Sequence, residues 1–406
     1  MDSLAGKRSV AALRKALKDL RNASTVSKDG TSALDDAYEK AMERIQRQKG
    51  DMPSDAMTIL SWILHSRRQL RVAELREALA VEIGKSELDP DNIPTVEHIT
   101  RACAGLVVID EESDIIRLVH YTQEYLERVQ KRWFKTSQAN IAKTLITCLS
   151  FTASRSHRRP SIMVREDVEE LHTLYRYAID NWGHHAREAL VHGTEAHFII
   201  LFLESDHNLE VASQAMSKEH IRFTNEPECS TALHVAAFFG LDIAISILLE
   251  KGHDASAQDE DGITPLWWAA RMGHLSSVEL LHSWGAGLHD KDTWFWRSPL
   301  FWAARNNHIS VVELLLKDRV VIDSQDSEGT TALATASEEG NMGIVKLLLE
   351  HGAHPDSQTK ESNLDQRVSE ATGKPLFQAL KNGHEDIVRL LLSYEASVNA
   401  KDENGT

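Results

Sequence analysis

The chain has 406 residues with 42% apolar content, which suits two or three soluble globular units better than one compact core. No apolar run approaches the ~18 residues of a membrane span, so we expect no membrane contact. Three widely spaced cysteines without a CxxC pair argue against a disulfide framework or a zinc site. We therefore expect a reducing, intracellular setting, the cytoplasm or alternatively the nucleus. Residues 201–406 hold 16 Lys plus Arg against 32 Asp plus Glu and carry the whole net charge of −16, which disfavours nucleic acid as their ligand because phosphate backbones are repelled.

The apolar pattern of residues 51–135 predicts a winged-helix domain, that is, three helices followed by a β-hairpin. The first helix starts beside Pro53, a residue that fits the first turn of a helix, and the third ends at Gly105. An acidic turn separates the two strands. The predicted elements are helices 54–65, 73–81 and 96–104 and strands 106–109 and 115–119.

A winged helix can place its third helix in a DNA groove, which gives the chain an alternative function as a DNA-associated regulator. Here that helix offers Arg101 beside Glu97, and the hairpin tip at 110–114 is acidic. A surface that contacts phosphates needs the opposite charge. We therefore favour protein packing over DNA reading for this domain.

Residues 136–225 predict a helical linker, and four histidines crowd one stretch of it. The adjacent pair cannot share a helical face, and no fixed i, i+4 pairing with a carboxylate recurs. We therefore expect structural or solvent-facing histidines and no metal. The four are His184, His185, His192 and His197.

A phrase related to Thr-Pro-Leu-x-x-Ala-Ala recurs through the second half of the chain. Its leucines stand 33, 34, 33 and 43 residues apart. The last step contains an insertion with polar residues 360–366, which predicts an extended loop. A period in the low thirties indicates stacked repeats instead of a closed domain. The leucines are Leu233, Leu266, Leu300, Leu333 and Leu376.

Each phrase precedes a turn residue and a second apolar segment, which predicts a helix, a left-handed corner and a second helix. Glycine suits the corner because it reaches positive φ without penalty, and asparagine is the next best tolerated. The pattern resembles the ankyrin repeat over residues 226–406, with about five repeats and a truncated one. The corner residues are Gly240, Gly273, Asn307, Gly340 and Gly383.

The copies depart from the ankyrin pattern in two ways. The phrase keeps its histidine only as His234, and in the family this histidine ties adjacent finger loops by hydrogen bonds. We therefore expect packing to hold the later fingers, with Trp268 and Trp302 in the core between repeats. Arg319 stands where a helix-ending glycine is usual, so we expect a looser corner there.

Several phrases of the first half resemble segments of fungal NACHT and ankyrin proteins, NLR-like signal-transducing (STAND) switches. Their winged helix is of the type named after GPI inositol-deacylase, a name that carries no hydrolase with it. The resemblance implies that residues 1–50 are a helical segment following a NACHT ATPase core absent from this chain. We expect an internal piece of a longer protein or a truncated gene product. The phrases are residues 71–82, 103–107, 116–122 and 181–187.

The resemblance also implies a nucleotide-sensing role for His120. In NACHT switches a histidine at this end of the winged helix touches the β-phosphate of bound ADP, so nucleotide would bind only with a NACHT domain present. Here the run Gln123-Glu124-Tyr125 begins one residue early, which rotates the following helix by about a third of a turn relative to His120. A histidine that only ends a strand is the alternative.

The sequence contains no P-loop, nucleophile elbow, His-Glu-x-x-His pair or glycine-rich dinucleotide loop. We therefore expect no enzyme activity and no cofactor. The expected fold is mostly α, a winged helix and a helical linker followed by an ankyrin-repeat α-solenoid. The expected function is a protein-interaction scaffold, the regulatory and partner-recognising part of a NACHT-type switch.

The fingertips and helix corners of such a solenoid form its curved binding face. The tripeptide Trp294-Phe295-Trp296 lies in a finger one residue longer than its neighbours, and aromatic residues with Arg dominate interface energies. Either these rings contact a partner or they pack between repeats in place of the lost histidines. The predicted protein-binding residues are Phe238, Phe239, Glu260, Ile263, Arg271, Met272, Trp294, Trp296, Arg297, Arg305, Asn306, Glu328, Thr330, Glu338 and Lys381.

Overall fold

The computed structural model describes residues 33–119, 122–155, 173–191, 196–216, 230–356 and 374–398. Its contacts divide the chain into two compact units, residues 1–185 and 186–406, with the division inside helix α9 (Tyr175–Val191). Within the described residues, no helix has the length and apolar content that crossing a membrane requires. The predicted features outside these ranges are residues 1–32, His120, His192, the loop at 360–366 and the repeat fragment at 402–406.

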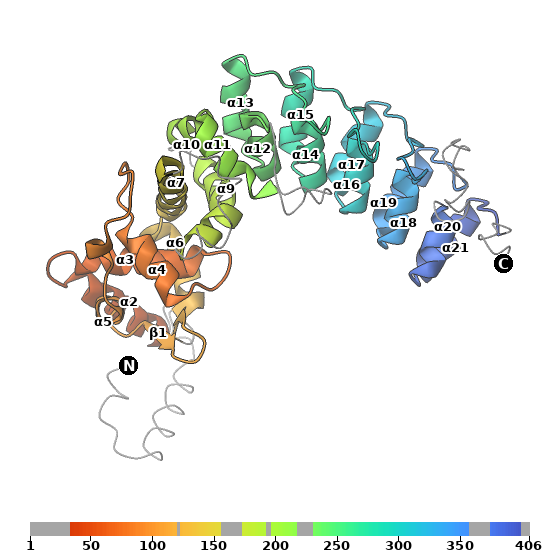
Figure 1. Cartoon of the computed structure of the whole chain (residues 1–406). Coiled ribbons are helices and arrows are strands. Elements are labelled where there is room, and N and C mark those ends of the chain that lie inside the picture. Colours follow the sequence, from red (N-terminus) through yellow and green to blue (C-terminus); the bar gives the residue numbers. More distant parts are fainter. Residues whose placement is uncertain are drawn as a thin grey trace. The chain divides into compact units, whose positions relative to one another are not determined.

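The first unit contains the predicted helices and hairpin in the predicted order (Figure 1). A short 3₁₀ turn, Pro90–Asn92, precedes the third helix of the winged helix. The helices are α2 (Ala33–Gln46), α3 (Met52–His65), α4 (Val72–Ala80), α5 (Val96–Ala102), α6 (Thr122–Trp133) and α7 (Ser137–Arg155).

Helix α3 is the centre of the winged helix, because it contacts α2, α4, α5, α6, α7 and the strand β2 (Ile115–Leu118). Its apolar residues are spread around its circumference, and Ile59, Leu60 and Trp62 are fully buried. A helix that is apolar on most sides is stable only when other elements surround it. The broad apolar pattern of this segment therefore predicted its central place.

The hairpin follows α5 directly. Ala104 and Gly105 both adopt left-handed backbone, with φ of 50° and 86°, and turn the chain into β1 (Val107–Asp110). Strand β1 pairs antiparallel with β2, with Val107 opposite Leu118. The N–H of Ile116 also donates to the carbonyl of Leu70, so the segment before α4 lies beside β2 as a short third strand-like segment of the hairpin. Three helices and this hairpin confirm the predicted winged helix.

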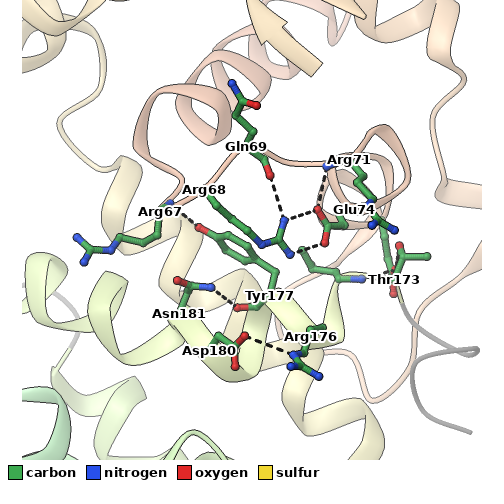
Figure 2. Close-up of polar contacts among 12 residues, drawn as sticks. Arg67, Arg68, Gln69, Arg71, Glu74, Thr173, Arg176, Tyr177, Asp180 and Asn181 are labelled. Atoms are coloured by element: carbon green, nitrogen blue, oxygen red, sulfur yellow. Dashed lines mark hydrogen bonds and ion pairs between the residues drawn. The ribbon is translucent and has the colours of Figure 1, made fainter. Parts of the chain in front are cut away.

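A polar network ties helix α9 to the start of α4 (Figure 2). The Tyr177 hydroxyl accepts the backbone N–H of Arg67 at 3.0 Å, and the Arg68 guanidinium lies 5.0 Å from the centroid of the Tyr177 ring. Arg68 also donates two hydrogen bonds of 2.8 and 2.6 Å to the buried carboxylate of Glu74. The same carboxylate accepts the N–H of Arg71, which caps the first turn of α4. The ring of Tyr177 and the carboxylate of Glu74 thus hold α9 and the start of α4 together through Arg68.

His185 extends the network into α7. Its Nε2 lies 2.9 Å from the Tyr177 hydroxyl and its Nδ1 lies 2.6 Å from Oε1 of Gln138. Burial lowers the pKa of His185 to about 3, so the ring is neutral at physiological pH. His185 therefore has a structural role. Among the described side chains, no group of three or more His, Cys, Asp or Glu is arranged to hold a metal ion.

The second unit is a stack of helix pairs, drawn from green to blue in Figure 1. First helices contact one another in succession, and so do second helices, as stacked repeats require. The first helices are α12 (Ala232–Phe239), α14 (Pro265–Met272), α16 (Pro299–Arg305), α18 (Ala332–Glu338) and α20 (Pro375–Lys381). The second helices are α13 (Asp242–Glu250), α15 (Leu275–Ser283), α17 (Ile309–Lys317), α19 (Met342–Glu350) and α21 (Glu385–Ser393).

One further helix pair precedes the first phrase-bearing repeat. Helix α10 (Ala196–Leu203) contacts α13, and α11 (Asp206–Ser213) contacts α12. The apolar residues of α10, which form the longest apolar run of the sequence, include Ile199, Ile200 and Phe202, all of them buried. This pair therefore covers the first edge of the stack.

The core of the stack is made by the repeated phrase. Its five leucines are buried, and the alanine pairs of the first three phrases are fully buried, which lets neighbouring helices approach closely. Trp268 and Trp302 are buried as predicted, and the ring of Trp302 meets that of Trp267 edge to face, with centroids 5.4 Å apart. Such pairs contribute about 0.5–1.5 kcal/mol beyond the area they bury.

The predicted corners adopt left-handed backbone, with φ between 62° and 79° at Gly240, Gly273, Asn307, Gly340 and Gly383. After each of the last four corners, the next residue donates a side-chain hydrogen bond to a carbonyl at the end of the preceding repeat's first helix. We call this series the corner ladder. Its contacts are His274 to Phe238, His308 to Arg271, Asn341 to Arg305 and His384 to Glu338, at 2.9–3.0 Å.

The corner at Arg319 is looser than its counterparts, as predicted. Arg319 has a φ of 55°, a conformation that disfavours side chains with a Cβ. The following hydrogen bond, from the N–H of Val320 to the carbonyl of Leu315, is 3.5 Å long. At the glycine-containing corner of the first repeat, the equivalent bond from His253 to Leu248 is 3.1 Å.

Candidate protein-interaction surface

Each of three successive finger loops is built around one buried aspartate. Asp259, Asp292 and Asp326 all accept backbone N–H groups from residues two to five positions further along. Burial raises the pKa of Asp259 to about 6, because the charged form loses its water. The hydrogen bonds to these carboxylates fix the shape of each finger, although burying a carboxylate away from water costs free energy.

Side chains of the repeated phrase bond to the finger that follows them in the chain. His234 accepts the N–H of Thr231 at its Nδ1, 3.0 Å away, and donates from Nε2 to the carbonyl of Ile263 at 2.9 Å. In the next repeat the indole N–H of Trp267 donates to the carbonyl of Arg297 at 3.1 Å. The expectation that packing alone replaces the histidine is therefore wrong at Trp267, because an indole N–H reaches the same kind of acceptor.

The finger over residues 292–297, which we call the Trp finger, differs from its neighbours at the left-handed position. The neighbouring fingers place Gly262 and Gly329 there, with φ of 71° and 78°, each two residues before the helix cap. In the Trp finger the same place is held by Trp296 with a φ of 55°. A bulky residue in this conformation costs roughly 1–2 kcal/mol relative to glycine.

The strained backbone of the Trp finger is held from both sides. Asp292 accepts the N–H of Phe295 at 2.7 Å and the N–H of Arg297 at 3.2 Å. Across the fingers, the N–H of Ser327 donates to the carbonyl of Phe295 at 2.7 Å. The conformation of Trp296 is therefore fixed by its surroundings.

The rings of the Trp finger divide into inward and outward groups. Phe295 is half-buried under the guanidinium of Arg297, whose carbon lies 4.5 Å from the ring centroid. Trp294 and Trp296 are 51% and 62% exposed, although the indole N–H of Trp294 donates to Asp261 at 2.8 Å. Of the two predicted alternatives, packing between repeats fits Phe295 and exposure to a partner fits Trp296. Trp294 combines both, because its ring is exposed while its N–H bonds to the preceding finger.

Four of the predicted protein-binding residues are buried, so the expectation that they face a partner is corrected. Phe238 and Phe239 pack against each other, and Phe238 also meets Trp268. Ile263 is buried inside the first finger. The guanidinium of Arg271 lies 3.9 Å from the centroid of Trp302, so this residue is part of the aromatic core.

The remaining predicted residues reach the surface to different extents. Glu260, Asn306, Glu328 and Lys381 are exposed, while Met272, Arg297, Arg305, Thr330 and Glu338 are half-buried. Arg305 forms an ion pair of 3.1 Å with Glu339, and the Asn306 amide donates to the carbonyl of Arg271. Two of the exposed aromatic side chains of the array, Trp294 and Trp296, thus lie together on the Trp finger, between the tips of its two neighbours.

Sequence reasoning missed the residues that support this finger. Arg297 forms a 3.1 Å ion pair with Asp326 of the next finger, and the side chains of the two are 11% and 0% exposed. The signal was present in the recurring aspartate that opens each finger, at 259, 292 and 326. The predicted set included Arg297 as a contact residue, whereas the structure uses it as a brace.

In the winged helix, the third helix does not present a basic surface. It carries Arg101 as its only Arg or Lys, and the acidic tip of the hairpin includes Asp110, which pairs with Arg117. The hydrogen bond from Glu112 and this pair hold the pKa of Asp110 below its usual value. His120, the predicted nucleotide-sensing residue, lies outside the described residues.

The geometry defines a class of protein: an α-helical repeat solenoid in a chain that also contains a winged helix. Comparison with known families agrees with both parts. Residues 199–292 and 285–359 match the family described as ankyrin repeats, and residues 375–403 match a single ankyrin repeat. Residues 42–132 match the winged helix domain of GPI inositol-deacylase. The chain therefore contains ankyrin repeats and a winged helix of that type.

Similar curated proteins share the repeats with this chain. Rabankyrin-5 from Mus musculus is 29% identical over 171 residues, which is 42% of this chain and 14% of that protein. The ankyrin repeat and KH domain-containing protein mask-1 from Caenorhabditis elegans is 34% identical over 174 residues, or 41% of this chain and 6% of that protein. Potassium channel AKT2/3 from Arabidopsis thaliana is 33% identical over 30% of this chain and 15% of its own length. The chain thus spans a small part of each relative.

Proposed function

We propose that this chain is a non-enzymatic protein-interaction scaffold whose ankyrin repeats recognise a partner through the Trp finger. The observation that carries the proposal is Trp296, an exposed bulky residue at a left-handed position where both neighbouring fingers use glycine. Backbone strain that the surroundings hold in place is characteristic of functional sites. A residue that costs stability and buries little area is best explained by a contact made outside the chain.

The test compares partner capture by the full chain with capture by a variant carrying Trp294→Ala and Trp296→Ala together. Both chains are immobilised at equal density, and proteins retained from an extract of the source cells are quantified by mass spectrometry. We expect a small set of proteins to be lost from the variant, while the free energy of unfolding falls only by about 0.5–1.5 kcal/mol, because Trp294 no longer donates to Asp261. Indistinguishable sets of retained proteins would reject the binding role of the finger. A much larger loss of stability together with unchanged retention would assign the tryptophans to stability.

We further propose that the scaffold is the regulatory and partner-recognising part of a NACHT-type signalling switch, in a cytoplasmic setting. Support comes from the phrases at 71–82 and 181–187, which resemble such proteins, and from the combination of a winged helix with ankyrin repeats. In this proposal His120 reports on nucleotide only when a NACHT domain is present. In a homologue that has that domain, unchanged ADP retention and basal activation after replacement of the equivalent histidine by Ala would contradict it.

The alternative function, a DNA-associated regulator, makes a distinct prediction. If the winged helix reads DNA, the full chain should bind a labelled duplex with an affinity that falls steeply as salt rises. The acidic hairpin tip and the single cation of α5 lead us to expect no such binding. A DNA affinity that depends steeply on salt, with a dependence that Arg101→Ala reduces, would favour this alternative.

The non-enzymatic role has its own test. ATP turnover by the chain would contradict it.

A further inference from the structure

The exposed surface of the Trp finger is aromatic. Trp294 and Trp296 are about equally exposed and lie two residues apart on a short turn that Asp292 holds rigid. Tryptophan offers the most favourable ring face for a cation, and aromatic groups held in one conformation lose little entropy on binding. The finger therefore presents preorganised ring faces.

The cations that belong to the Trp finger are directed inward. Lys291 donates from Nζ to the carbonyl of Gln325 at 2.8 Å. Arg297 is engaged with Asp326 and lies over the ring of Phe295. Both cations of the finger are thus engaged by acceptors within the array, Lys291 by a carbonyl and Arg297 by a carboxylate.

Acidic side chains lie on both sides of the Trp finger. Glu260 and Glu328 are exposed tip residues of the preceding and following fingers. Asp261, next to Glu260, accepts the indole N–H of Trp294, and Ser327, next to Glu328, donates to the carbonyl of Phe295. Each glutamate is therefore one residue away from a hydrogen bond to the Trp finger.

Ring faces bordered by carboxylates define one ligand chemistry. We propose that the Trp finger, together with Glu260 and Glu328, binds a segment of a partner protein that carries an arginine or lysine next to an apolar side chain. The cation lies over a tryptophan face and is attracted by the flanking carboxylates, while the apolar neighbour covers the rest of the ring. An acidic segment is repelled by the same carboxylates, and the net charge of −16 strengthens both effects at low salt. This inference rests on the proposed function and names its partner class.

The test uses three fluorescein-labelled synthetic peptides of equal length, built from Arg-Leu, Ser-Leu or Glu-Leu pairs, and follows their anisotropy on titration with the full chain. We expect the Arg-Leu peptide to bind at least ten times more tightly than the Ser-Leu peptide, and the Glu-Leu peptide not to bind. Trp296→Gly should weaken Arg-Leu binding at least tenfold with an unchanged or raised unfolding midpoint. Glu328→Gln should weaken it severalfold and flatten its salt dependence.

The control is Trp284→Ala, because Trp284 is also 50% exposed but belongs to the C-terminal cap of helix α15 and not to the finger turn at 292–297. It should leave Arg-Leu affinity unchanged. Two outcomes would overturn the inference: an equal loss of Arg-Leu affinity in Trp284→Ala and Trp296→Gly, or no loss of affinity in Trp296→Gly. Either would show that the cationic peptide binds the acidic array without using the finger.

Selection of peptides from a random display library on the full chain separates this inference from the proposed function. Enrichment of Arg- or Lys-containing apolar peptides that no longer bind Trp296→Gly supports both. Enrichment of acidic or uncharged peptides that depend on Trp296 overturns the inference and leaves the scaffold standing. Failure to enrich any finger-dependent peptide, together with no binding of the Arg-Leu peptide, counts against both.

Discussion

The corner glycines of the repeats share a backbone conformation but differ in what lies against them. A Cβ on Gly273 would overlap the imidazole of His308, whereas a Cβ on Gly383 would meet nothing within 4 Å. Both residues have positive φ, 76° and 75°. Substitution of Gly383 therefore measures the free-energy cost of the left-handed backbone alone. Substitution of Gly273 adds the cost of displacing the His308 side chain of the corner ladder.

We expect Gly383→Ala to lower the free energy of unfolding by about 1–2 kcal/mol, the cost of left-handed backbone. Gly273→Ala should lower it by about 1 kcal/mol more, because His308 must move and its hydrogen bond to Arg271 is lost. Urea unfolding followed by tryptophan fluorescence measures both. Equal losses in the two variants would show that His308 yields without cost.

The buried His234 makes the stability of the first repeat depend on pH. Burial lowers its pKa in the folded state to about 4, from about 6.5 in the unfolded chain. The unfolded chain therefore binds more protons between these values, so the stabilisation is complete above pH 6.5 and is lost as pH falls towards 4. The full effect is about 3 kcal/mol.

We expect His234→Gln to be less stable than the parent at pH 7 and to lose less stability on acidification. Hydrogen exchange of the α12 amides at pH 7 and pH 5 measures this local effect. His351→Gln, at an exposed position of the fourth repeat, is the control and should keep the parental pH dependence. If His234→Gln kept the pH dependence of the parent chain, the pH dependence of stability could not be assigned to His234.

At the scale of the finger loop, one carboxylate supports several donors. Asp326 accepts the N–H groups of Glu328 and Thr330 and the Nε–H of Arg297, and its side chain is fully buried. Asp326→Ala leaves a guanidinium without its buried partner, which costs about 3–5 kcal/mol. Thermal unfolding should show a clear fall for Asp326→Ala and a change within about 0.5 kcal/mol for the exposed Glu328→Ala. A comparable loss of stability in Asp326→Ala and Glu328→Ala would contradict a stabilising role for the ion pair between Arg297 and Asp326.

The helices and corners were predictable from the sequence because they depend on local patterns. Leucine spacing gave the first helices, and the turn residues gave the left-handed corners. The tie from Trp267 to Arg297 was not predictable, because it needs the distance between two fingers. The burial of Arg271 also escaped prediction, since a cation at the helix end is enclosed only when the rings of Trp267, Trp268 and Trp302 surround it.

At the scale of the whole molecule, the repeats are stabilised mainly by their neighbours, so the position of a defect in the stack decides how far it spreads. Leu300 lies in a middle repeat and Leu376 in the last described one, and both are buried. Truncation of either to Ala costs about 2–5 kcal/mol. Leu300→Ala should reduce hydrogen-exchange protection in α14, α16 and α18, whereas Leu376→Ala should affect α20 and α21. Identical exchange patterns would indicate a single cooperative array.

The order of the winged helix and the repeats was also predictable, because several motifs agreed along the chain. The helix pair α10 and α11 was predicted only as part of a linker, since it lacks the repeated phrase. Its contacts with α13 and α12, and a family match that begins at residue 199, connect it to the stack. Contact with a neighbour reveals such a covering pair where a sequence pattern does not.

The link between His384 and Glu338 joins two repeats whose phrases lie 43 residues apart, yet its 3.0 Å length equals that of the link between His274 and Phe238 in a 33-residue step. A 43-residue step and a 33-residue step thus end in the same joint between neighbouring repeats. The register of the helix pairs is consequently independent of the length of chain between them, so a reporter peptide added to a step should leave the corner ladder unchanged.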